Sequence, residues 1–182
     1  TMLELDARLR ARRDVRAFFD AKFREQKRRH ERYQDAAYNR EPNIKESPGG
    51  LRDLQMVIWL ARAASFGTSW RAMADRGLIT PSEAAGITLN ERILQDLRVR
   101  LHLAAGRRED RLVFDHQIAM AKSLKLKGKP GMAPSDLLMR RYYLAAKAIW
   151  RFNQILLANL FDRVTPRSER KSRKLDDDFQ VV

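Results

Sequence analysis

PSDLLMRRYYLAAKAIWRFNQILLANLF, residues 134–161, is the stretch that decides the fold of this chain. Its apolar positions follow one another in steps of four and three residues, which places them on one face of a helix. These positions are Leu138, Tyr142, Ala145, Ile149, Phe152, Leu156 and Leu160. Such a face is typical of a helix in a bundle, where burying each large aliphatic side chain contributes about 1.5–3 kcal/mol.

The segments upstream of this stretch also have helical periodicity, and no alternating strand pattern appears among them. They predict helices at 51–67, 68–77, 80–106 and 115–124. The helix at 80–106 has the clearest ends. Thr80 and Glu83 form a capping box around Pro81, and Gly106 stops the helix. A turn-rich loop at 126–134 precedes the last helix.

A long basic helix is predicted at 3–33, where good helix formers surround a narrow apolar stripe. The sequence therefore predicts an all-α fold, a helical bundle of about five to six helices with one long N-terminal and one long C-terminal helix. The predicted divisions are an N-terminal basic helix at 1–36, a helical bundle domain at 37–163 and a linker at 164–182. The linker is predicted from its basic and then acidic composition.

Composition narrows the class of protein. The 182 residues include 37 Lys and Arg against 23 Asp and Glu, a net charge of +14 that favours nucleic acid, an anionic ligand or an acidic protein surface. The absence of cysteine excludes disulfides and thiol catalysis. The longest apolar run, MVIWLA at 56–61, is far shorter than the ~20 residues of a membrane helix. We therefore predict a cytoplasmic protein that does not enter a membrane.

The stretch EPNIKESPGGLRDLQ, residues 41–55, predicts a tight turn followed by a helix. Pro48 suits the second position of the turn, and Gly49 the third, where φ is positive. Gly50 allows close approach of the backbone to a neighbour. A helix start with free N–H groups, between Lys45 and Arg52, is the chemistry of a phosphate site. An ordinary connector with an acidic first turn is the alternative interpretation.

Carboxylates and histidines do not predict a metal site in this chain. Asp53 and Glu46 lie beside the predicted phosphate site and would repel a phosphate unless a metal ion separated them. The three histidines, His30, His102 and His116, are far apart in sequence, so we predict no metal ligands here. We expect His30 to be exposed and the other two to serve in local packing or hydrogen bonds.

Three segments resemble the bacterial PII uridylyltransferase/uridylyl-removing enzymes. RYQDAAYNREPNIKESPGGLRDLQMVIWLAR at 32–62 contains the motif N-(I/V)-K-E-(G/S)-P-G-G-L-R-D-(L/I)-Q, intact from Asn43 to Gln55. LRVRLHLAAGRREDRLVFDHQIAMAKSLK at 97–125 and LLMRRYYLAAKAIWRFNQILLANLF at 137–161 extend the similarity over most of the chain, in the family's order.

The resemblance implies a place in a larger enzyme. Members of the family have a nucleotidyltransferase domain, a helical segment, an HD-type phosphohydrolase domain and two ACT domains. They transfer a uridylyl group from UTP to a tyrosine of the signalling protein PII, with Mg²⁺, and remove it again. This chain looks like the helical segment. It lacks the family's Gly-Ser and paired-Asp motif and its His-Asp pair, so we expect no complete active site and an inactive isolated chain, with the Mg²⁺ ligands elsewhere.

The implied partners are UTP, PII and the enzyme's own nucleotidyltransferase and HD domains. At the edge of the nucleotide site, the family motif implies a role for seven residues: Asn43, Lys45, Glu46, Gly49, Gly50, Arg52 and Asp53. In this hypothesis Lys45, Arg52 and the glycine turn face the phosphates, while Asp53 orients Arg52 or approaches a metal ion.

A second candidate surface lies in GRREDRLVFD, residues 106–115. Arg107, Arg108, Asp110 and Arg111 predict either a docking surface for PII or a neighbouring domain, or an ordinary solvated junction. Two further hypotheses compete with the uridylyltransferase assignment. One is a stand-alone nucleic-acid-binding module, which the even spread of basic residues disfavours. The other is a protein-docking helical module that binds no nucleotide.

Overall fold

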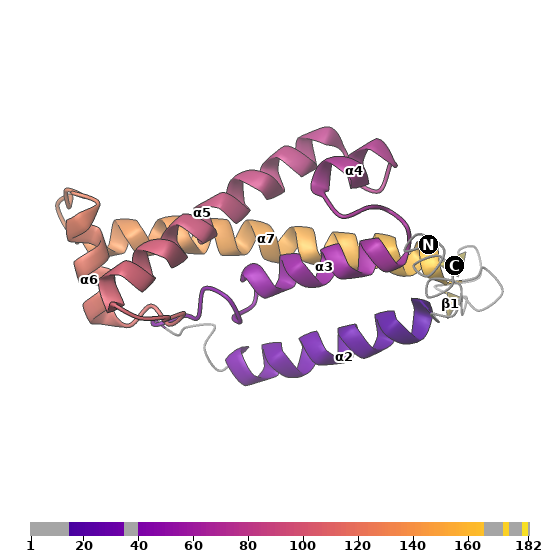
Figure 1. Cartoon of the computed structure of the whole chain (residues 1–182), viewed down its shortest axis with the longest axis horizontal. Helices are drawn as coiled ribbons and strands as arrows, with labels where there is room; N and C mark the ends of the chain where they lie inside the picture. Colours follow the sequence, from indigo (N-terminus) through magenta and orange to yellow (C-terminus); the bar gives the residue numbers. More distant parts are fainter. Residues whose placement is uncertain (1–14, 35–39, 166–172, 175–179, 182) are drawn as a thin grey trace, which may run out of the picture.

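The computed structural model describes residues 15–34, 40–165, 173–174 and 180–181. Within these residues the chain forms six α-helices, and the predicted all-α bundle is confirmed. The helices are α2 (Val15–Gln34), α3 (Leu51–Ala63), α4 (Trp70–Asp75), α5 (Pro81–Ala105), α6 (Phe114–Ser123) and α7 (Pro134–Val164). Figure 1 shows α7 running the length of the molecule, with α3 beside it, α2 outside α3, and α5 crossing on the opposite side.

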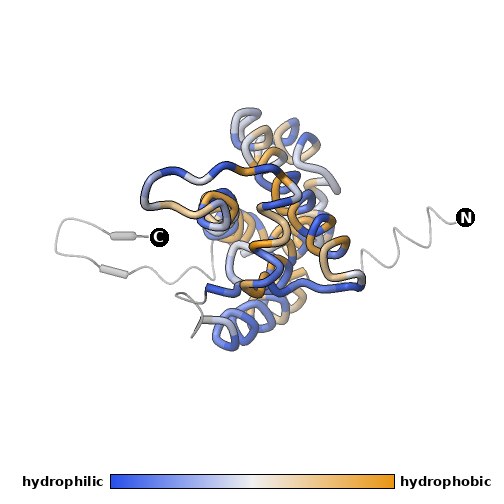
Figure 2. The backbone as a smooth tube through the Cα atoms, turned by 90° about the vertical axis from the view of Figure 1, so that its left-hand side faces the viewer, coloured by the Kyte–Doolittle hydropathy of each residue, from blue (hydrophilic) through white to orange (hydrophobic). Residues whose placement is uncertain are grey.

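The central helix α7 owes its position to the apolar face predicted from its spacing. Six of the seven predicted positions are buried, whereas Phe152 is only partly buried. This face packs against α3, α5 and α6, and the hydrophobic colouring of Figure 2 gathers where these helices meet. Burial of this face, and not helix propensity alone, therefore holds the bundle together.

Helix α5 begins and ends where its sequence predicts. The Thr80 hydroxyl accepts a hydrogen bond from the Glu83 amide, and the Glu83 carboxylate accepts one from the Thr80 amide at 2.7 Å. Pro81 occupies the first turn, and Gly106 ends the helix with φ of 64°. These contacts satisfy amides that a helix start would leave without partners.

We expect Thr80→Ala to lower the free energy of unfolding by about 1 kcal/mol, because it removes one half of the capping box. Urea unfolding followed by circular dichroism measures the loss. Ser82→Ala, a change at an exposed position two residues later, is the matched control. It should leave the free energy of unfolding within about 0.5 kcal/mol of the parent. Equal losses in both variants would contradict a capping role.

Helix α2 lies on the bundle through a narrow contact. Phe19 and Gln26 are buried, while most of its other described side chains face solvent. Its contacts are with α3 and α7, and it stands out as the hydrophilic helix in Figure 2. The predicted start of this helix, before Val15, lies outside the described residues.

The structure adds details that the sequence patterns do not predict. The tail contains a short antiparallel pair, β1 (Arg173–Lys174) and β2 (Gln180–Val181), where only a linker is predicted. Trp150 is 45% exposed although it lies near the middle of the central helix. Trp70 is the buried tryptophan, and its Nε1 donates to Glu91 Oε2 at 2.7 Å. No helix in the described part of the chain is long and apolar enough to cross a bilayer.

Candidate functional site

The motif loop before α3 is shaped by its own side chains. The Asn43 side-chain oxygen accepts hydrogen bonds from the backbone amides of Lys45 at 3.0 Å and Glu46 at 2.8 Å. The Ser47 hydroxyl accepts one from the Asn43 amide at 3.0 Å. Asn43 is therefore a turn-forming residue, which is a common use of an asparagine side chain next to its own backbone.

The two glycines let this loop press against α7. Gly49 has φ of 76°, and the Gly50 amide donates to the Ser47 carbonyl at 2.8 Å, which closes the predicted turn. A Cβ at Gly49 would overlap the carbonyl oxygen of Ala146 and lie 2.8 Å from its carbonyl carbon. A Cβ at Gly50 would lie 2.6–2.8 Å from three carbonyl oxygens of the loop itself. Both positions therefore require glycine for packing.

The amides at the start of α3 do not point toward solvent, so the predicted bare-amide anion site is wrong. The Leu51 amide donates to the Ile44 carbonyl at 3.2 Å, and the Arg52 amide to the Lys45 carbonyl at 2.9 Å. The Gly49 amide donates to the Asp53 carboxylate at 2.8 Å. The loop folds back over the helix end, and its own oxygens occupy the donors that a phosphate would need.

Asp53 is the centre of a buried polar network, and the carboxylate that pairs with Arg52 is that of Glu46. Its side chain is fully buried and accepts hydrogen bonds from Gln26 Nε2 at 3.0 Å, from His30 Nε2 at 2.9 Å and from Arg29. His30 is therefore not the exposed residue that was expected, because only 12% of its side chain is accessible. These contacts join α2 to the motif.

Asn153 of α7 completes this network, and it is absent from the sequence-predicted site. It is fully buried; its side-chain amide donates to the Asp53 carbonyl at 3.3 Å, and its oxygen accepts from Gln26 at 2.7 Å. The sequence does carry one indication of it. An asparagine directly beside the apolar seam position Phe152 is unusual in a bundle core unless it has a buried partner.

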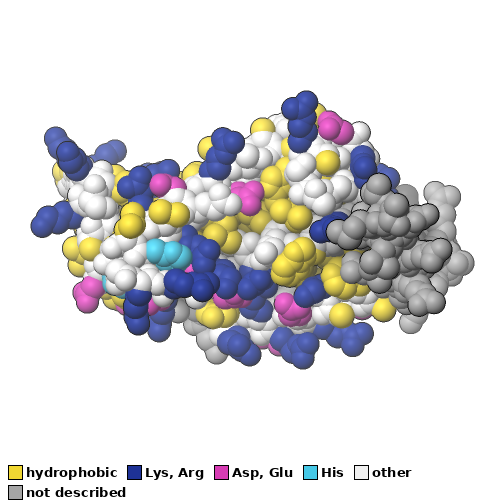
Figure 3. Space-filling model, viewed as in Figure 1, with side chains coloured by type: hydrophobic (Ala, Val, Ile, Leu, Met, Phe, Trp, Pro, Cys, Tyr) yellow, Lys and Arg dark blue, Asp and Glu magenta, His cyan; other side chains and the backbone are white. Residues whose placement is uncertain are grey.

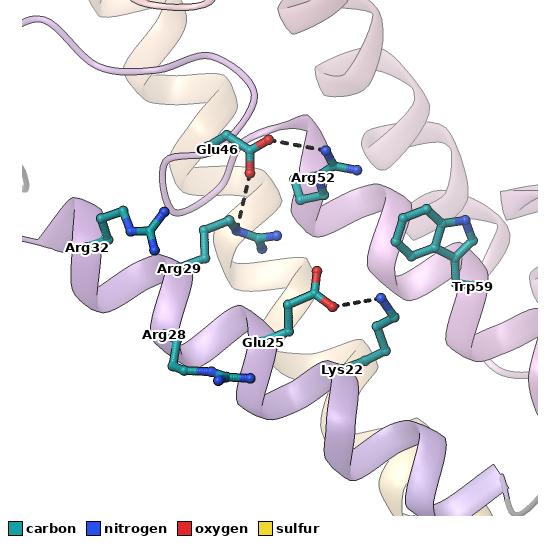
Figure 4. Close-up of a pocket in the computed structure, with 8 residues that line it drawn as sticks. All are labelled: Lys22, Glu25, Arg28, Arg29, Arg32, Glu46, Arg52 and Trp59. Atoms are coloured by element: carbon teal, nitrogen blue, oxygen red, sulfur yellow. Dashed lines mark hydrogen bonds and ion pairs between the residues drawn. The ribbon is translucent and has the colours of Figure 1, made fainter.

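A basic pocket of about 450 Å³ lies between α2 and the start of α3. Its lining residues are Lys22, Glu25, Arg28, Arg29, Arg32, Glu46, Arg52 and Trp59. Figure 4 shows Glu46 of the motif between Arg29 of α2 and Arg52 of α3, and Figure 3 shows Lys and Arg side chains gathered along this edge. The motif therefore contributes its charged side chains, and not its amides, to a cationic hollow.

The charged motif residues meet at Glu46. Its carboxylate lies 3.2 Å from the Arg52 guanidinium and 3.3 Å from Lys45 Nζ. Arg52 also donates to Gln55 Oε1 at 2.8 Å. A second hollow of about 350 Å³, between α3 and α5, is lined by Lys45, Arg52 and Trp59 among others. Arg52 and Trp59 thus border both hollows.

The predicted docking residues divide into two groups. Asp110 and Arg111 hold the motif: the Ile44 amide donates to the Asp110 carbonyl at 2.8 Å, and Arg111 pairs with Glu41 at 3.2 Å. Arg107 and Arg108 are exposed, and Arg107 pairs with Glu109 at 3.1 Å. Arg111 is also more than half exposed, so docking through the three arginines stays a prediction.

Asp110 is partly buried, and cationic side chains surround its carboxylate. Burial raises the pKa of Asp110, but hydrogen bonding and attraction to Arg98, with help from His102, outweigh it and leave the pKa below its usual value. Asp110 is therefore ionised at neutral pH and fixes the segment that pairs with the motif.

No group of three His, Asp or Glu side chains in the described part of the chain is placed to hold a metal ion. Asp53, the most buried carboxylate of the motif, already accepts from four donors. The described residues therefore do not fit a magnesium site.

Comparison with known proteins decides the family. The family model described as GlnD PII-uridylyltransferase matches residues 17–157, from α2 through most of α7. The chain belongs to the GlnD PII-uridylyltransferase family. The match to the GlnD family takes in both walls of the basic pocket, together with the whole motif.

Three GlnD relatives illustrate the similarity. Bifunctional uridylyltransferase/uridylyl-removing enzymes of Bordetella parapertussis, Nitrosospira multiformis and Burkholderia thailandensis are 48%, 50% and 51% identical to the chain over 179, 165 and 162 residues. The alignments cover 98%, 91% and 89% of this chain but 21%, 19% and 19% of those relatives. The chain thus spans about a fifth of the length of the curated GlnD proteins it matches. No solved structure matches it.

Proposed function

We propose that this chain is the helical domain of a bifunctional uridylyltransferase/uridylyl-removing enzyme and that it helps to hold the phosphates of UTP. The longer enzyme would transfer the uridylyl group to PII and remove it again. It would act in the cytoplasm and would not bind a membrane. The chain itself would supply positioning and positive charge, with no complete active site. Its family membership and the names of its relatives support this proposal.

The observation that carries the proposal is the position of Arg52. This motif residue borders the basic pocket, where Glu46 and Gln55 fix its guanidinium. Lys45 lies beside it, on the wall of the neighbouring hollow. In nucleotidyl transfer a protein acts mainly by positioning the phosphates and stabilising their charge, which are tasks for fixed cations.

The magnesium ion belongs elsewhere in this proposal. It would neutralise phosphate charge during transfer, and its ligands would come from the nucleotidyltransferase domain. The described residues of this chain would instead present Arg52 and Lys45 to the outer side of the phosphates. Asn43, Gly49, Gly50 and Asp53 would act indirectly, by holding the loop that carries those two cations.

In the longer protein we expect Arg52→Ala to raise the KM for UTP in uridylylation by about tenfold or more, since a charged hydrogen bond to phosphate contributes roughly 1.5–3 kcal/mol. Steady-state kinetics with PII as acceptor measures it. Arg62→Ala, an exposed change on the same helix, is the matched control and should leave the KM unchanged. Uridylyl removal should be normal in both variants. An unchanged KM in Arg52→Ala would exclude contact with the nucleotide.

A PII-binding role is the second candidate function, and one observation favours it. Arg107 and Arg108 are exposed just beyond the end of α5, four and five residues after Leu103, which is 77% exposed. Adjacent apolar and cationic groups suit a protein partner. In that case Arg107 and Arg108 substitutions would raise the KM for PII and leave the KM for UTP unchanged.

A further inference from the structure

We infer that the pocket between α2 and α3 is a built phosphate-binding site, most of whose cations come from α2, and that the Glu46 carboxylate occupies it when phosphate is absent. This extends the proposed function from the motif to a helix outside the motif. The inference rests on the proposed function only for the identity of the phosphate compound. Whether the pocket binds phosphate at all can be tested on the chain alone.

Charge is the first argument. Five cationic side chains and two carboxylates line the pocket, so three positive charges are in excess. Several of these charges are already paired: Lys22 with Glu25 at 2.7 Å, and Arg52 with Glu46 at 3.2 Å. Arg28 and Arg32, one turn apart on α2, make no ion pair with any described carboxylate. Because Arg29 is paired with Asp53, outside the pocket lining, Arg28 and Arg32 are the two cations that remain available to an anion.

Arg29 is the second and independent argument. Only 10% of its side chain is exposed, and its Nε is buried without a hydrogen-bond acceptor among the described residues. The paired Glu46 Oε2 lies 4.0 Å from this nitrogen, too far for a hydrogen bond. A buried donor without a partner is uncommon in native proteins and points to a missing acceptor. An oxygen of a bound phosphate would satisfy it.

Glu46 defines what the ligand must replace. Its carboxylate is drawn toward Lys45, Arg29 and Arg52 at once, yet it satisfies Arg29 poorly. A phosphate carries more charge and more acceptor oxygens than a carboxylate, so it can engage the same cations together with Arg28 and Arg32. The size of the pocket, about 450 Å³, is within the usual range for small-ligand sites.

The ligand class is a compound with two or more linked phosphates, either inorganic or attached to a nucleoside. A single phosphate would reach the Arg29 end only, because the α2 cations from Lys22 to Arg32 are spread along nearly three turns of the helix. Trp59 at the opposite end lies under Lys22 Nζ, 4.9 Å from the ring centre. Its fluorescence offers a second readout at the pocket wall.

The test is isothermal titration of the full 182-residue chain with inorganic pyrophosphate at low salt, where charge interactions are least screened. We expect Arg28→Ala/Arg32→Ala to weaken binding about tenfold or more, since two charged contacts are lost. Glu46→Gln should strengthen binding several-fold, because it removes the competing carboxylate. Arg140→Ala, an exposed change on α7 outside the pocket, should bind as the parent does.

These variants avoid the buried network, so folding is checked simply by circular dichroism. Failure of the parent chain to bind pyrophosphate, or equal affinity in the double variant, would overturn the inference. Weaker binding in Glu46→Gln would also overturn it, since Glu46 would then be part of the site and not its occupant.

Titration with UTP separates the two sources of phosphate. Tighter binding of UTP than of pyrophosphate, lost in the same double variant, identifies a nucleotide site. Equal affinities identify an inorganic polyphosphate site, and both results support the inference. If the double variant loses pyrophosphate binding while the longer protein carrying it uridylylates PII with a normal KM for UTP, the phosphate site stands but does not hold UTP. The proposed function then stands or fails on the KM of Arg52→Ala.

Discussion

Gly49→Ala is expected to destabilise the chain by about 3 kcal/mol or more, because a Cβ there meets the backbone of α7 and the residue must keep a positive φ. The Ala146 carbonyl cannot rotate away as a side chain would, so the loop or the central helix has to shift. A typical domain has a free energy of unfolding of about 5–15 kcal/mol, so the loss is a large part of the total. Urea unfolding followed by circular dichroism measures it.

Gly131→Ala is the matched control for this prediction. Gly131 has nearly the same φ, 75°, but a Cβ there would meet nothing within 4 Å. It therefore carries the conformational cost of about 1–2 kcal/mol without the clash. If the two variants lose the same stability, the contact between the motif and α7 contributes nothing, and the packing account of the double glycine is wrong.

Asp53→Ala is expected to cost about 3–5 kcal/mol, because it leaves the buried Arg29 guanidinium without its counter-charge. The same change leaves the Gly49 amide without an acceptor and removes one of the two acceptors of Gln26 Nε2. Asp53→Asn should lie between the parent and the alanine variant, since it keeps one acceptor oxygen but not the charge. Thermal unfolding of the three proteins gives the order.

Asp96→Ala controls for the loss of an ion pair as such. Asp96 pairs with Arg100 at 3.0 Å, one turn along α5, and both side chains are more than a third exposed. We expect that change to cost no more than about 0.5 kcal/mol. A comparable loss from Asp53→Ala would show that the Asp53 network is not buried in solution.

Helix ends could be predicted from the sequence because they depend on neighbouring residues. The capping box at Thr80 and the stop at Gly106 require residues no more than three positions apart. The seam of α7 likewise follows from spacing within one helix. The turn at Pro48 and Gly49 was predictable for the same reason, and its positive φ is confirmed.

The candidate site was less predictable because its contacts join distant segments. The partners of Asp53 come from α2, 23–27 residues earlier, and Asn153 is 100 residues later. Nothing local distinguishes Arg28 and Arg32 from the other basic residues of α2. The motif sequence predicted an anion site built from helix amides together with Lys45 and Arg52. The carbonyls of Ile44 and Lys45 that occupy two of those amides become visible only when the loop is folded.

The Asp53 network also limits how this protein can be shortened. A version beginning at the motif would leave the Asp53 side chain in the bundle interior after removing three of its partners, Gln26, Arg29 and His30, which all lie on α2. We expect the truncated protein to aggregate or to lose its packed core. A loss of activity in it would therefore say nothing about the chemistry of the motif. Truncated versions of this protein should therefore keep the whole of α2, because its side chains complete the bundle interior.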